Sequence, residues 1–407
     1  MRVGTPGFVG ERLKEAREAR GMTASTLAES LEVSRQAISR YENNDLSPSP
    51  EVMRKISEAL DLPLHFFLRP LTRPEEGVFH FRSTTAATKM SRSRAERRFI
   101  WLREIVCSIQ RYVKFPKVNY PDFHPPGDPS HLSDEAIVDF ATGTRRFWGL
   151  RDGPISDVVQ LLENNGTILA RHELASTNLD AFSRWGESDR TPYIILGTDK
   201  GSAVRSRYDV AHELGHLVLH RNVSRNLANQ KAIHALMERQ AHRFAGSFLL
   251  PERTFSADVY SISLDALRAL KPKWKVSIAF MLHRASSLDL VNDEQARKLW
   301  INLQRRGWRA KEPLDEVIEP EEPKLLERSL RLLAEHQLLN VQDIAHEYGF
   351  RDSDIESLVG MSPGTLGAIH RPLGLIRLPS SSQMGMPTPP DDPSDDDRDI
   401  IQFPSRY

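Results

Sequence analysis

The segment AHELGHLVLH, residues 211–220, contains the pattern His-Glu-x-x-His. On a helix, His212 and His216 lie one turn apart on one face, so both imidazoles can bind one metal ion. Glu213 stands beside the first histidine, where a carboxylate can take a proton from water at the metal. Gly215, between the ligands, leaves room for a substrate near the helix. The pattern predicts two zinc ligands and a general base, and the alternative is a helix whose histidines only pack.

A catalytic zinc site needs a third protein ligand and an open position for water. The metzincin extension would require glycine at position 219 and histidine at position 222. The chain has Leu219 and Asn222, which excludes that class. Glu238, in the downstream segment HALMERQAHRFAGSFLLP, is separated from the motif by enough residues for a second, antiparallel helix to fold back. We expect Glu238 to be the third ligand, and His242 is the alternative.

Length and composition limit the classes of protein that these residues can belong to. The chain has 407 residues, equal numbers of basic and acidic side chains, and one cysteine, Cys107. The length predicts two or three domains, and the single cysteine excludes a disulfide framework and a cysteine-ligated zinc site. Apolar runs are too short to span a bilayer, and the N-terminus lacks a signal-peptide pattern, so we expect a cytoplasmic protein with no membrane partner.

Residues 8–70 predict a bundle of five short helices. Gly21 ends the first helix, and Thr23, Ser34 and Ser49 are placed to cap the next three. Two of these helices, at about 23–30 and 34–43, are joined by a tight turn and contain the small and aliphatic residues that allow packing at a steep angle. The arrangement predicts a helix-turn-helix.

The segment MTASTLAESLEVSRQAISRYENNDLSPSPEVMRKISEAL resembles the lambda-repressor/Cro type of helix-turn-helix, the XRE family. The resemblance implies binding to double-stranded operator DNA, with the second helix in the major groove, and it implies a homodimer on paired half-sites. The donor-rich side chains at the start of that helix are the candidate DNA contacts: Arg35, Gln36, Ser39 and Arg40. The family's helix-ending glycine is replaced by Asn44, which also tolerates the left-handed conformation.

The segments RYDVAHELGHLVLH and ERQAHRFAGSFLLP resemble the ImmA/IrrE metallopeptidase family. The resemblance implies one zinc ion bound by His212, His216 and Glu238, with Glu213 as the general base. The position of His242 is commonly Asn or Asp in the family, and the resemblance implies that this residue orients a ligating imidazole.

The two resemblances together predict a transcriptional regulator with a zinc-dependent endopeptidase domain that cleaves a regulatory protein, such as a repressor, in a phage-element or stress response. Two alternatives belong to other classes. The peptidase-like domain could be a non-catalytic sensor of a ligand or metal, or the chain could be an antitoxin that neutralises a partner protein. Cleavage of a partner repressor separates the first function from the others.

The whole chain predicts a mainly helical α+β fold with a small sheet. The expected parts are a DNA-binding domain at 8–70, a linker at 71–79, a zincin-like peptidase domain at 80–310, a helical extension at 311–377 and a disordered acidic tail at 378–407. Strands are expected at 166–172 and 193–198, and no internal repeat is evident. The basic segment 80–114 predicts either extra phosphate contacts or the solvated face of a helix.

Overall fold

The computed structural model describes residues 4–71, 80–81, 89–172, 180–186, 189–197, 202–338, 341–369 and 401–402. Helices dominate these residues, and the largest sheet among them is small, which confirms the predicted fold class. The predicted linker and acidic tail lie almost wholly outside the described residues. The chain forms two compact units, one of Met1–Thr72, Glu96–Phe115 and Leu326–Tyr407, the other of Arg73–Ala95 and Pro116–Leu325.

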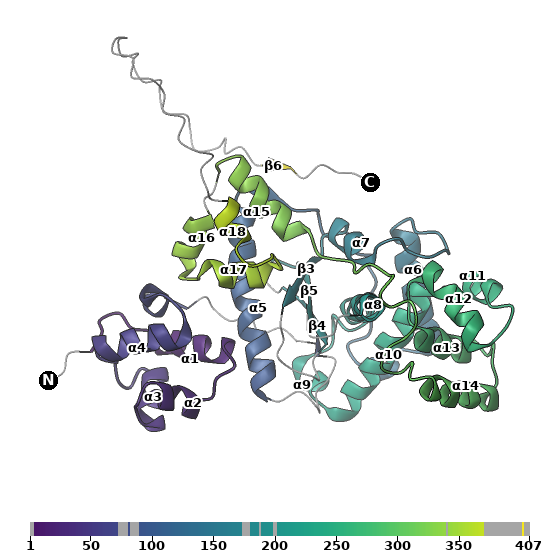
Figure 1. Cartoon of the computed structure of the whole chain (residues 1–407), viewed down its shortest axis with the longest axis horizontal. Coiled ribbons are helices and arrows are strands. Elements are labelled where there is room, and N and C mark those ends of the chain that lie inside the picture. The colour runs from purple at the N-terminus through teal and green to yellow at the C-terminus, as the bar shows by residue number, and fades with distance from the viewer. Residues whose placement is uncertain are drawn as a thin grey trace, which may run out of the picture. The chain divides into compact units, whose positions relative to one another are not determined.

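Unit 1 contains the predicted five-helix bundle, a long helix and the C-terminal helices. The bundle consists of α1 (Gly10–Ala19), α2 (Ala24–Ser30), α3 (Arg35–Glu42), α4 (Pro50–Leu60) and the short 3-10 helix η1 (Leu64–Leu68). The later elements are α5 (Lys89–Gln110), β2 (Val113–Lys114), α15 (Leu325–Glu335), α16 (Val341–Tyr348), α17 (Asp352–Val359), α18 (Thr365–Ile369) and β6 (Ile401–Gln402). Figure 1 labels α1–α5, α15–α18 and β6 of this unit.

The helix ends of the bundle follow the local sequence. The side chains of Thr23, Ser34 and Ser49 accept hydrogen bonds from the backbone amides of the first turns of α2, α3 and α4, as predicted. Gly21 and Asn44 have φ angles of 69° and 60°, so the asparagine adopts the left-handed conformation expected in place of glycine. The Asn44 side chain also accepts a hydrogen bond from the amide of Gly10, at 2.6 Å.

Part of the basic segment 80–114 forms α5, and one face of α5 in unit 1 is buried in the core. Trp101, Leu102 and Ile105 are buried, and the Trp101 indole donates a hydrogen bond of 2.6 Å to Glu15. Arg98 is also buried and donates to Ser357 at 2.7 Å. Arg98 is therefore engaged within the unit, whereas Arg111 and Lys114 are exposed.

Unit 2 contains the small sheet and the helices that carry the His-Glu-x-x-His segment. Its strands are β1 (His80–Phe81), β3 (Ile168–His172), β4 (Ala181–Trp185) and β5 (Pro192–Gly197). Its helices are η2 (Pro129–His131), α6 (Asp134–Phe147), α7 (Val158–Asn164), α8 (Ala203–Leu219), α9 (Arg225–Ala228), α10 (Lys231–Leu249), α11 (Glu252–Asp258), α12 (Leu264–Trp274), α13 (Ile278–Ser287) and α14 (Asp293–Arg305).

The described strands of the sheet follow the order β1-β4-β5-β3. Strands β3 and β5 are parallel and agree with the predicted strands, with Ile168 opposite Tyr193. Strand β4 is antiparallel to β5 and is not among the predicted strands. Its polar residue Ser183 is fully buried and donates to the backbone carbonyl of Glu213 at 3.3 Å, so β4 contacts the motif helix directly.

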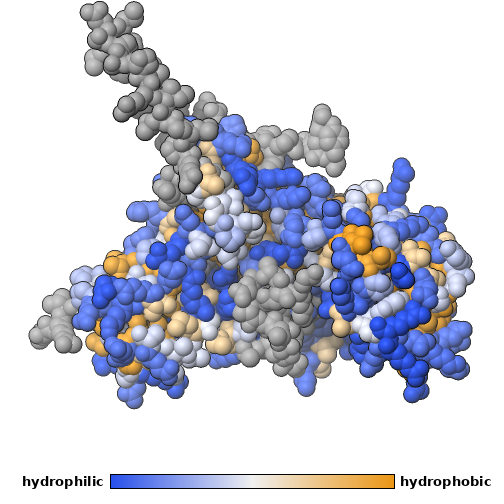
Figure 2. All heavy atoms as spheres, in the orientation of Figure 1, coloured by the Kyte–Doolittle hydropathy of each residue, from blue (hydrophilic) through white to orange (hydrophobic). Residues whose placement is uncertain are grey.

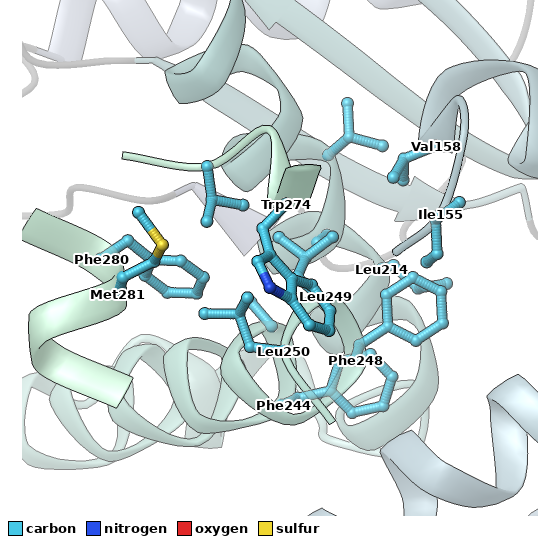
Figure 3. Close-up of a cluster of buried hydrophobic side chains, with 14 of the residues drawn as sticks. Ile155, Val158, Leu214, Phe244, Phe248, Leu249, Leu250, Trp274, Phe280 and Met281 are labelled. Atoms are coloured by element: carbon cyan, nitrogen blue, oxygen red, sulfur yellow. The ribbon is translucent and has the colours of Figure 1, made fainter. Parts of the chain in front are cut away.

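Helix α8 packs against strands β4 and β5 and also against α10, and α10 packs in turn on α6 (Figure 1). Aromatic and aliphatic side chains of α10 and its neighbours fill the core around it, including Phe244, Phe248 and Trp274 (Figure 3). Packing on both sides buries every residue of α8 from Val210 to Leu219. The core therefore fixes the position of the two helices that carry the candidate ligands.

Gly215 has a different role from the one predicted, because it faces α10 rather than a substrate. A Cβ atom at this position would lie 3.2 Å from Cα and 3.2 Å from the carbonyl oxygen of Ala241, and 3.2 Å from the Phe244 ring. Two of these neighbours are backbone atoms and cannot move independently of α10. The glycine therefore permits the close approach of α8 and α10.

We expect Gly215→Ala to lower the free energy of unfolding by about 1–3 kcal/mol, the usual cost of overpacking a core. Urea unfolding followed by circular dichroism measures the change. Gly153→Ala is the matched control, because a Cβ there would meet no atom within 4 Å. Equal stability of the Gly215→Ala variant and the wild type would contradict this account of the helix contact.

The segment after α14 is tied to unit 2 by buried ion pairs. Lys271 of α12 is fully buried and donates to Glu312 at 2.8 Å and to Asp315 at 2.6 Å. Glu321 accepts hydrogen bonds from the buried Arg207 of α8 and, at 2.8 Å, from the amide of Val158. Residues 311–325 thus belong to unit 2 rather than to the C-terminal helices of unit 1, whereas the predicted boundary lies at 310.

The surface view shows mainly hydrophilic side chains on the visible face, with smaller apolar patches between them (Figure 2). Within the described residues, no helix is both long enough and apolar enough to cross a membrane.

Candidate functional site

The side chains of His212, His216 and Glu238 converge between α8 and α10. The two Nε2 atoms of the histidines lie 3.2 Å apart. The Glu238 carboxylate oxygens lie 3.4 Å from Nε2 of His212 and 3.3 Å from Nε2 of His216. One ligand atom from each residue thus lies within 4.8 Å of the other two. Both histidines are buried, and Glu238 is partly exposed.

These separations fit a tetrahedral zinc site. Zinc bonds to histidine nitrogen and carboxylate oxygen are roughly 2.0–2.1 Å long, so tetrahedral angles place neighbouring ligand atoms about 3.3 Å apart. The three observed distances between His212, His216 and Glu238 all lie within about 0.1 Å of that value. The residues present therefore match both the number and the type of protein ligands in a catalytic zinc site.

Hydrogen bonds behind His216 set the tautomer of its ring. The Gln240 amide nitrogen donates to the carbonyl of Pro129 at 2.8 Å, so Oε1 of Gln240 is free to accept from Nε2 of His220 at 3.0 Å. Nδ1 of a neutral His220 then accepts from Nδ1 of His216, at 3.0 Å. Nε2 of His216 consequently carries a lone pair toward Glu238 and His212, the form that binds a metal.

A second chain of contacts lies behind His212. The Tyr208 hydroxyl is 3.2 Å from Nδ1 of His212 and 2.6 Å from Nδ1 of His242. Nε2 of His242 is 3.1 Å from Nδ1 of His283. If His212 donates from Nδ1, Tyr208 accepts that proton and donates its own to His242, and Nε2 of His212 also carries a lone pair. Tyr208 therefore links His242 to His212.

The contacts of His242 favour Glu238 over His242 as the third ligand. Both ring nitrogens of His242 lie within hydrogen-bonding distance of other side chains. Burial raises the pKa of the Glu238 carboxyl, whereas the adjacent His212 and His216 rings lower it, and the pKa lies below its usual range. Glu238 is thus a carboxylate at neutral pH, as metal ligation requires.

Other histidines and arginines near the motif lie close to neighbouring polar or charged side chains. His220 lies at the C-terminal end of α8, where it is buried and bonded to His216 and Gln240. His234 has Nε2 at 3.8 Å from the Glu238 carboxylate. Arg207 of α8 is buried and pairs with Glu321, so its role is structural.

Glu213, the predicted general base, directly follows His212 on α8 and has a relative exposure of 0%. Its backbone carbonyl is the acceptor for Ser183 of β4. The neighbouring ligands His212 and Glu238 line a pocket of about 540 Å³. Glu213 therefore follows His212, a residue of the pocket wall, on α8. The Glu213 side chain itself is enclosed by protein.

Two adjoining pockets lie beside the three converging side chains. The first, of about 540 Å³, includes His212 and Glu238 in its wall, and the second has a volume of about 380 Å³. Both are lined in part by Tyr208, His242, Phe280 and His283. The shared aromatic and imidazole side chains form a continuous surface next to the candidate ligands, with room for several residues of an extended peptide.

We expect Tyr208→Phe to weaken zinc binding by roughly 10- to 100-fold, the usual effect of removing a hydrogen-bond partner of a ligating histidine. Competition with a coloured chelator measures the affinity. Tyr260→Phe is the matched control, because that tyrosine is 91% exposed. Unchanged zinc affinity in the Tyr208→Phe variant would show that the hydroxyl does not orient His212.

The candidate DNA contacts lie together on the exposed side of α3. Arg35, Gln36, Ser39 and Arg40 are all exposed, while Ile38 and Tyr41 are buried on the opposite side of the helix. The second helix of a helix-turn-helix unit needs this division, because one face must pack on the bundle while the other enters the groove.

Comparisons with known families agree with both parts of the chain. Residues 13–67 match the family model described as a helix-turn-helix, and residues 163–286 match the peptidase M78 model, described as the IrrE N-terminal-like domain. Residues 13–67 are therefore similar to a helix-turn-helix domain of the XRE type, and residues 163–286 are similar to the M78, or ImmA/IrrE-like, peptidase domain.

Curated relatives match over a short stretch. A protein of Methanococcus vannielii named "Putative HTH-type transcriptional regulatory protein" is 49% identical over 55 residues, which cover 14% of this chain and 17% of that protein. A similarly named protein, MJ1164 of Methanocaldococcus jannaschii, is 51% identical over 55 residues with the same coverage. The chain thus aligns with about a sixth of the length of these relatives.

Proposed function

We propose that this protein is a transcriptional regulator whose M78 domain is a zinc-dependent endopeptidase that cleaves a regulatory protein of the repressor type, in a phage-element or stress response. The observation that carries the proposal is the convergence of His212, His216 and Glu238 at zinc-like separations beside a peptide-sized pocket. The proposed DNA-binding domain is 8–70, and the proposed peptidase domain lies in unit 2, which extends to Leu325.

In this proposal, His212, His216 and Glu238 hold one zinc ion, and Tyr208 and His220 orient the two imidazoles. When bound, zinc supplies a Lewis acid that lowers the pKa of water toward neutrality. Glu213 holds, on a carboxylate oxygen, the proton removed from the attacking water. As the peptide C–N bond breaks, Glu213 transfers this proton to the leaving amine nitrogen, so that one water is consumed for each bond cut.

The direct test is a cleavage assay. Zinc-loaded, full-length protein is incubated with each helix-turn-helix repressor encoded in its own genome, and fragments are identified by gel electrophoresis and mass spectrometry. We expect one repressor to be cut at a defined bond, the cutting to stop when dipicolinate removes zinc, and added zinc to restore it. Equal cleavage by the zinc-loaded and the chelated protein would refute the zinc-dependent mechanism.

A second candidate function is a DNA-binding regulator whose peptidase-like domain senses a ligand or metal without catalysis. One observation favours it: the side chain of Glu213 is completely enclosed, although a general base must reach water. Zinc-dependent change in DNA affinity without cleavage of any repressor would support the sensor. Cleavage of a repressor supports the peptidase.

For DNA binding, we expect Arg35→Ala and Arg40→Ala each to lower affinity by roughly 5- to 150-fold, corresponding to about 1–3 kcal/mol per base contact. Fluorescence anisotropy measures this effect with a duplex that the wild-type protein selects from a random pool. Arg297→Ala, an exposed position of α14 in unit 2, is the control and should change the affinity less than about twofold. The same selected duplex tests the proposed homodimer, because two chains should bind one duplex with paired half-sites.

A further inference from the structure

Helices α15, α16 and α17 repeat the spacing of α1, α2 and α3 within unit 1. Helix α3 spans Arg35–Glu42 and α17 spans Asp352–Val359, so each begins and ends 317 positions apart from the other. At the same separation, α2 (Ala24–Ser30) corresponds to α16 (Val341–Tyr348), and α1 (Gly10–Ala19) corresponds to α15 (Leu325–Glu335), within two residues at each end. Three consecutive helices therefore share one register.

The turn between the second and third helices also repeats. Glu32 has a φ angle of 57°, and its counterpart Gly349 has a φ angle of 66°. In the first turn, the amide of Val33 donates to the carbonyl of Ala28 at 3.0 Å. In the second, the amide of Phe350 donates to the carbonyl of Ala345 at 2.9 Å. Both turns therefore end the helix with the same backbone hydrogen bond and a left-handed residue at the same position.

Apolar core positions match in the same register. In each matched pair, both side chains are buried or one of the two is partly buried. The pairs are Leu13 with Leu330, Ala16 with Leu333, Leu27 with Ile344, Ala28 with Ala345, Leu31 with Tyr348, Val33 with Phe350, Ile38 with Ile355, and Tyr41 with Leu358. These positions hold the helices of a helix-turn-helix together, so the agreement extends from the backbone to the packing. We call residues 325–369 the second helix-turn-helix unit.

The two helix-turn-helix units of unit 1 differ on the helix face that would meet DNA. Helix α3 presents Arg35 and Arg40 to solvent, whereas α17 has three carboxylates, no lysine and no arginine. Two of these carboxylates are buried and engaged within unit 1. Asp354 accepts hydrogen bonds from Arg20 at 2.5 and 2.9 Å, and Glu356 accepts from the amides at the start of α18. An acidic helix committed in this way cannot bind phosphates.

Within unit 1, the second helix-turn-helix unit packs on the first helix-turn-helix bundle, residues 8–70. Phe350 lies against Phe66 of η1, with ring centroids 6.2 Å apart, and Gly349 approaches so closely that a Cβ there would be 2.8 Å from Cα of Phe66. The Arg69 guanidinium donates to the carbonyl of Tyr348 and lies over its ring. These contacts involve η1 and the residues next to it, and they leave the exposed side of α3 uncovered.

We propose that residues 325–369 are a second helix-turn-helix unit that does not bind DNA and whose partner is the first unit of the same chain. Each chain then contains one DNA-binding unit and one acidic unit docked on η1 and α1. The docking stabilises the DNA-binding unit from the side away from the groove. This proposal does not depend on peptidase activity.

The first part of the test measures DNA binding and compares matched positions of α3 and α17, the corresponding helices of the two helix-turn-helix units, in the whole chain. The probe is the duplex selected from a random pool by the wild-type protein. We expect Arg35→Ala with Gln36→Ala to lower affinity at least tenfold, and the counterpart pair Asp352→Ala with Ser353→Ala to change it less than twofold. A similar loss of affinity in both double variants would overturn the proposal, because the second unit would then bind DNA.

The docking arm uses hydrogen exchange measured by mass spectrometry. We expect Phe350→Ala to speed exchange in peptides covering 62–69 at least tenfold, while peptides covering 210–219 in unit 2 stay unchanged. Asp354→Asn, which keeps the side-chain size, is the second variant and should speed exchange around Arg20. Unchanged exchange at 62–69 and around Arg20 in both variants would overturn the docking of the second unit on the first.

Discussion

Glu213→Gln is expected to lower the rate of peptide-bond hydrolysis by about 10²- to 10⁴-fold, the range for loss of a general acid-base group. The amide has nearly the same size as the carboxylate but cannot hold the proton removed from water. The change should leave zinc binding intact, because His212, His216 and Glu238 supply the ligand atoms. Cleavage of the repressor substrate and zinc content by mass spectrometry are measured on the same sample.

Because Glu213 is buried, the folding of the Glu213→Gln protein must be checked as a control. The side chain is fully enclosed beside β4, so a substitution could act through stability rather than through proton transfer. Glu252→Gln, at an exposed position of α11, is the matched variant and should retain full activity. A Glu213→Gln protein that folds, binds zinc and cleaves at the wild-type rate would remove Glu213 from the mechanism and leave the hydrolase proposal without a base.

The parts of the fold that depend on neighbouring residues are predictable from the sequence. Thr23, Ser34 and Ser49 cap their helices because a hydroxyl two or three residues before an amide is sufficient for the bond. The spacing of His212 and His216 likewise places two imidazoles on one face of any helix. Even Glu238 is expected, since its family motif is recognisable.

The groups that orient the ligands are not predictable in the same way. Gln240 is directed by the carbonyl of Pro129, which is 111 positions away in the chain, and only that contact reveals why His220 is buried. Tyr208 acquires its role from His242 on a different helix. Strand β4 escapes prediction because buried Ser183 is polar, and its partner is a backbone carbonyl of α8.

The helix-turn-helix register of the C-terminal helices is hidden for a related reason. Few residues are identical between the two units, and Ala28 with Ala345 and Ile38 with Ile355 are among those few. The apolar positions agree only when the helix bounds and the left-handed turn residue are known. Core positions constrain size and polarity rather than residue identity, so a shared fold can persist where a sequence repeat is no longer evident.

Glu238→Gln is expected to weaken zinc binding by more than about 100-fold, beyond the range for residues that only orient a ligand. The substitution removes the one negative charge in the ligand set and keeps the volume of the side chain. Without that charge, two neutral imidazoles remain, and the site loses the carboxylate, whose Oε2 lies 3.4 Å from Nε2 of His212 and whose Oε1 lies 3.3 Å from Nε2 of His216. Competition titration with a coloured chelator measures the affinity.

His242→Asn is the informative comparison, because it separates the two candidates for the third ligand. Asparagine can still accept a hydrogen bond from Tyr208, so zinc affinity should fall by no more than about tenfold. Both ring nitrogens of His242 already lie within hydrogen-bonding distance of Tyr208 and His283, which opposes its use as a ligand. A larger loss of zinc in His242→Asn than in Glu238→Gln would reverse the assignment, since the ligand must be the residue whose removal costs more affinity than the loss of an orienting contact.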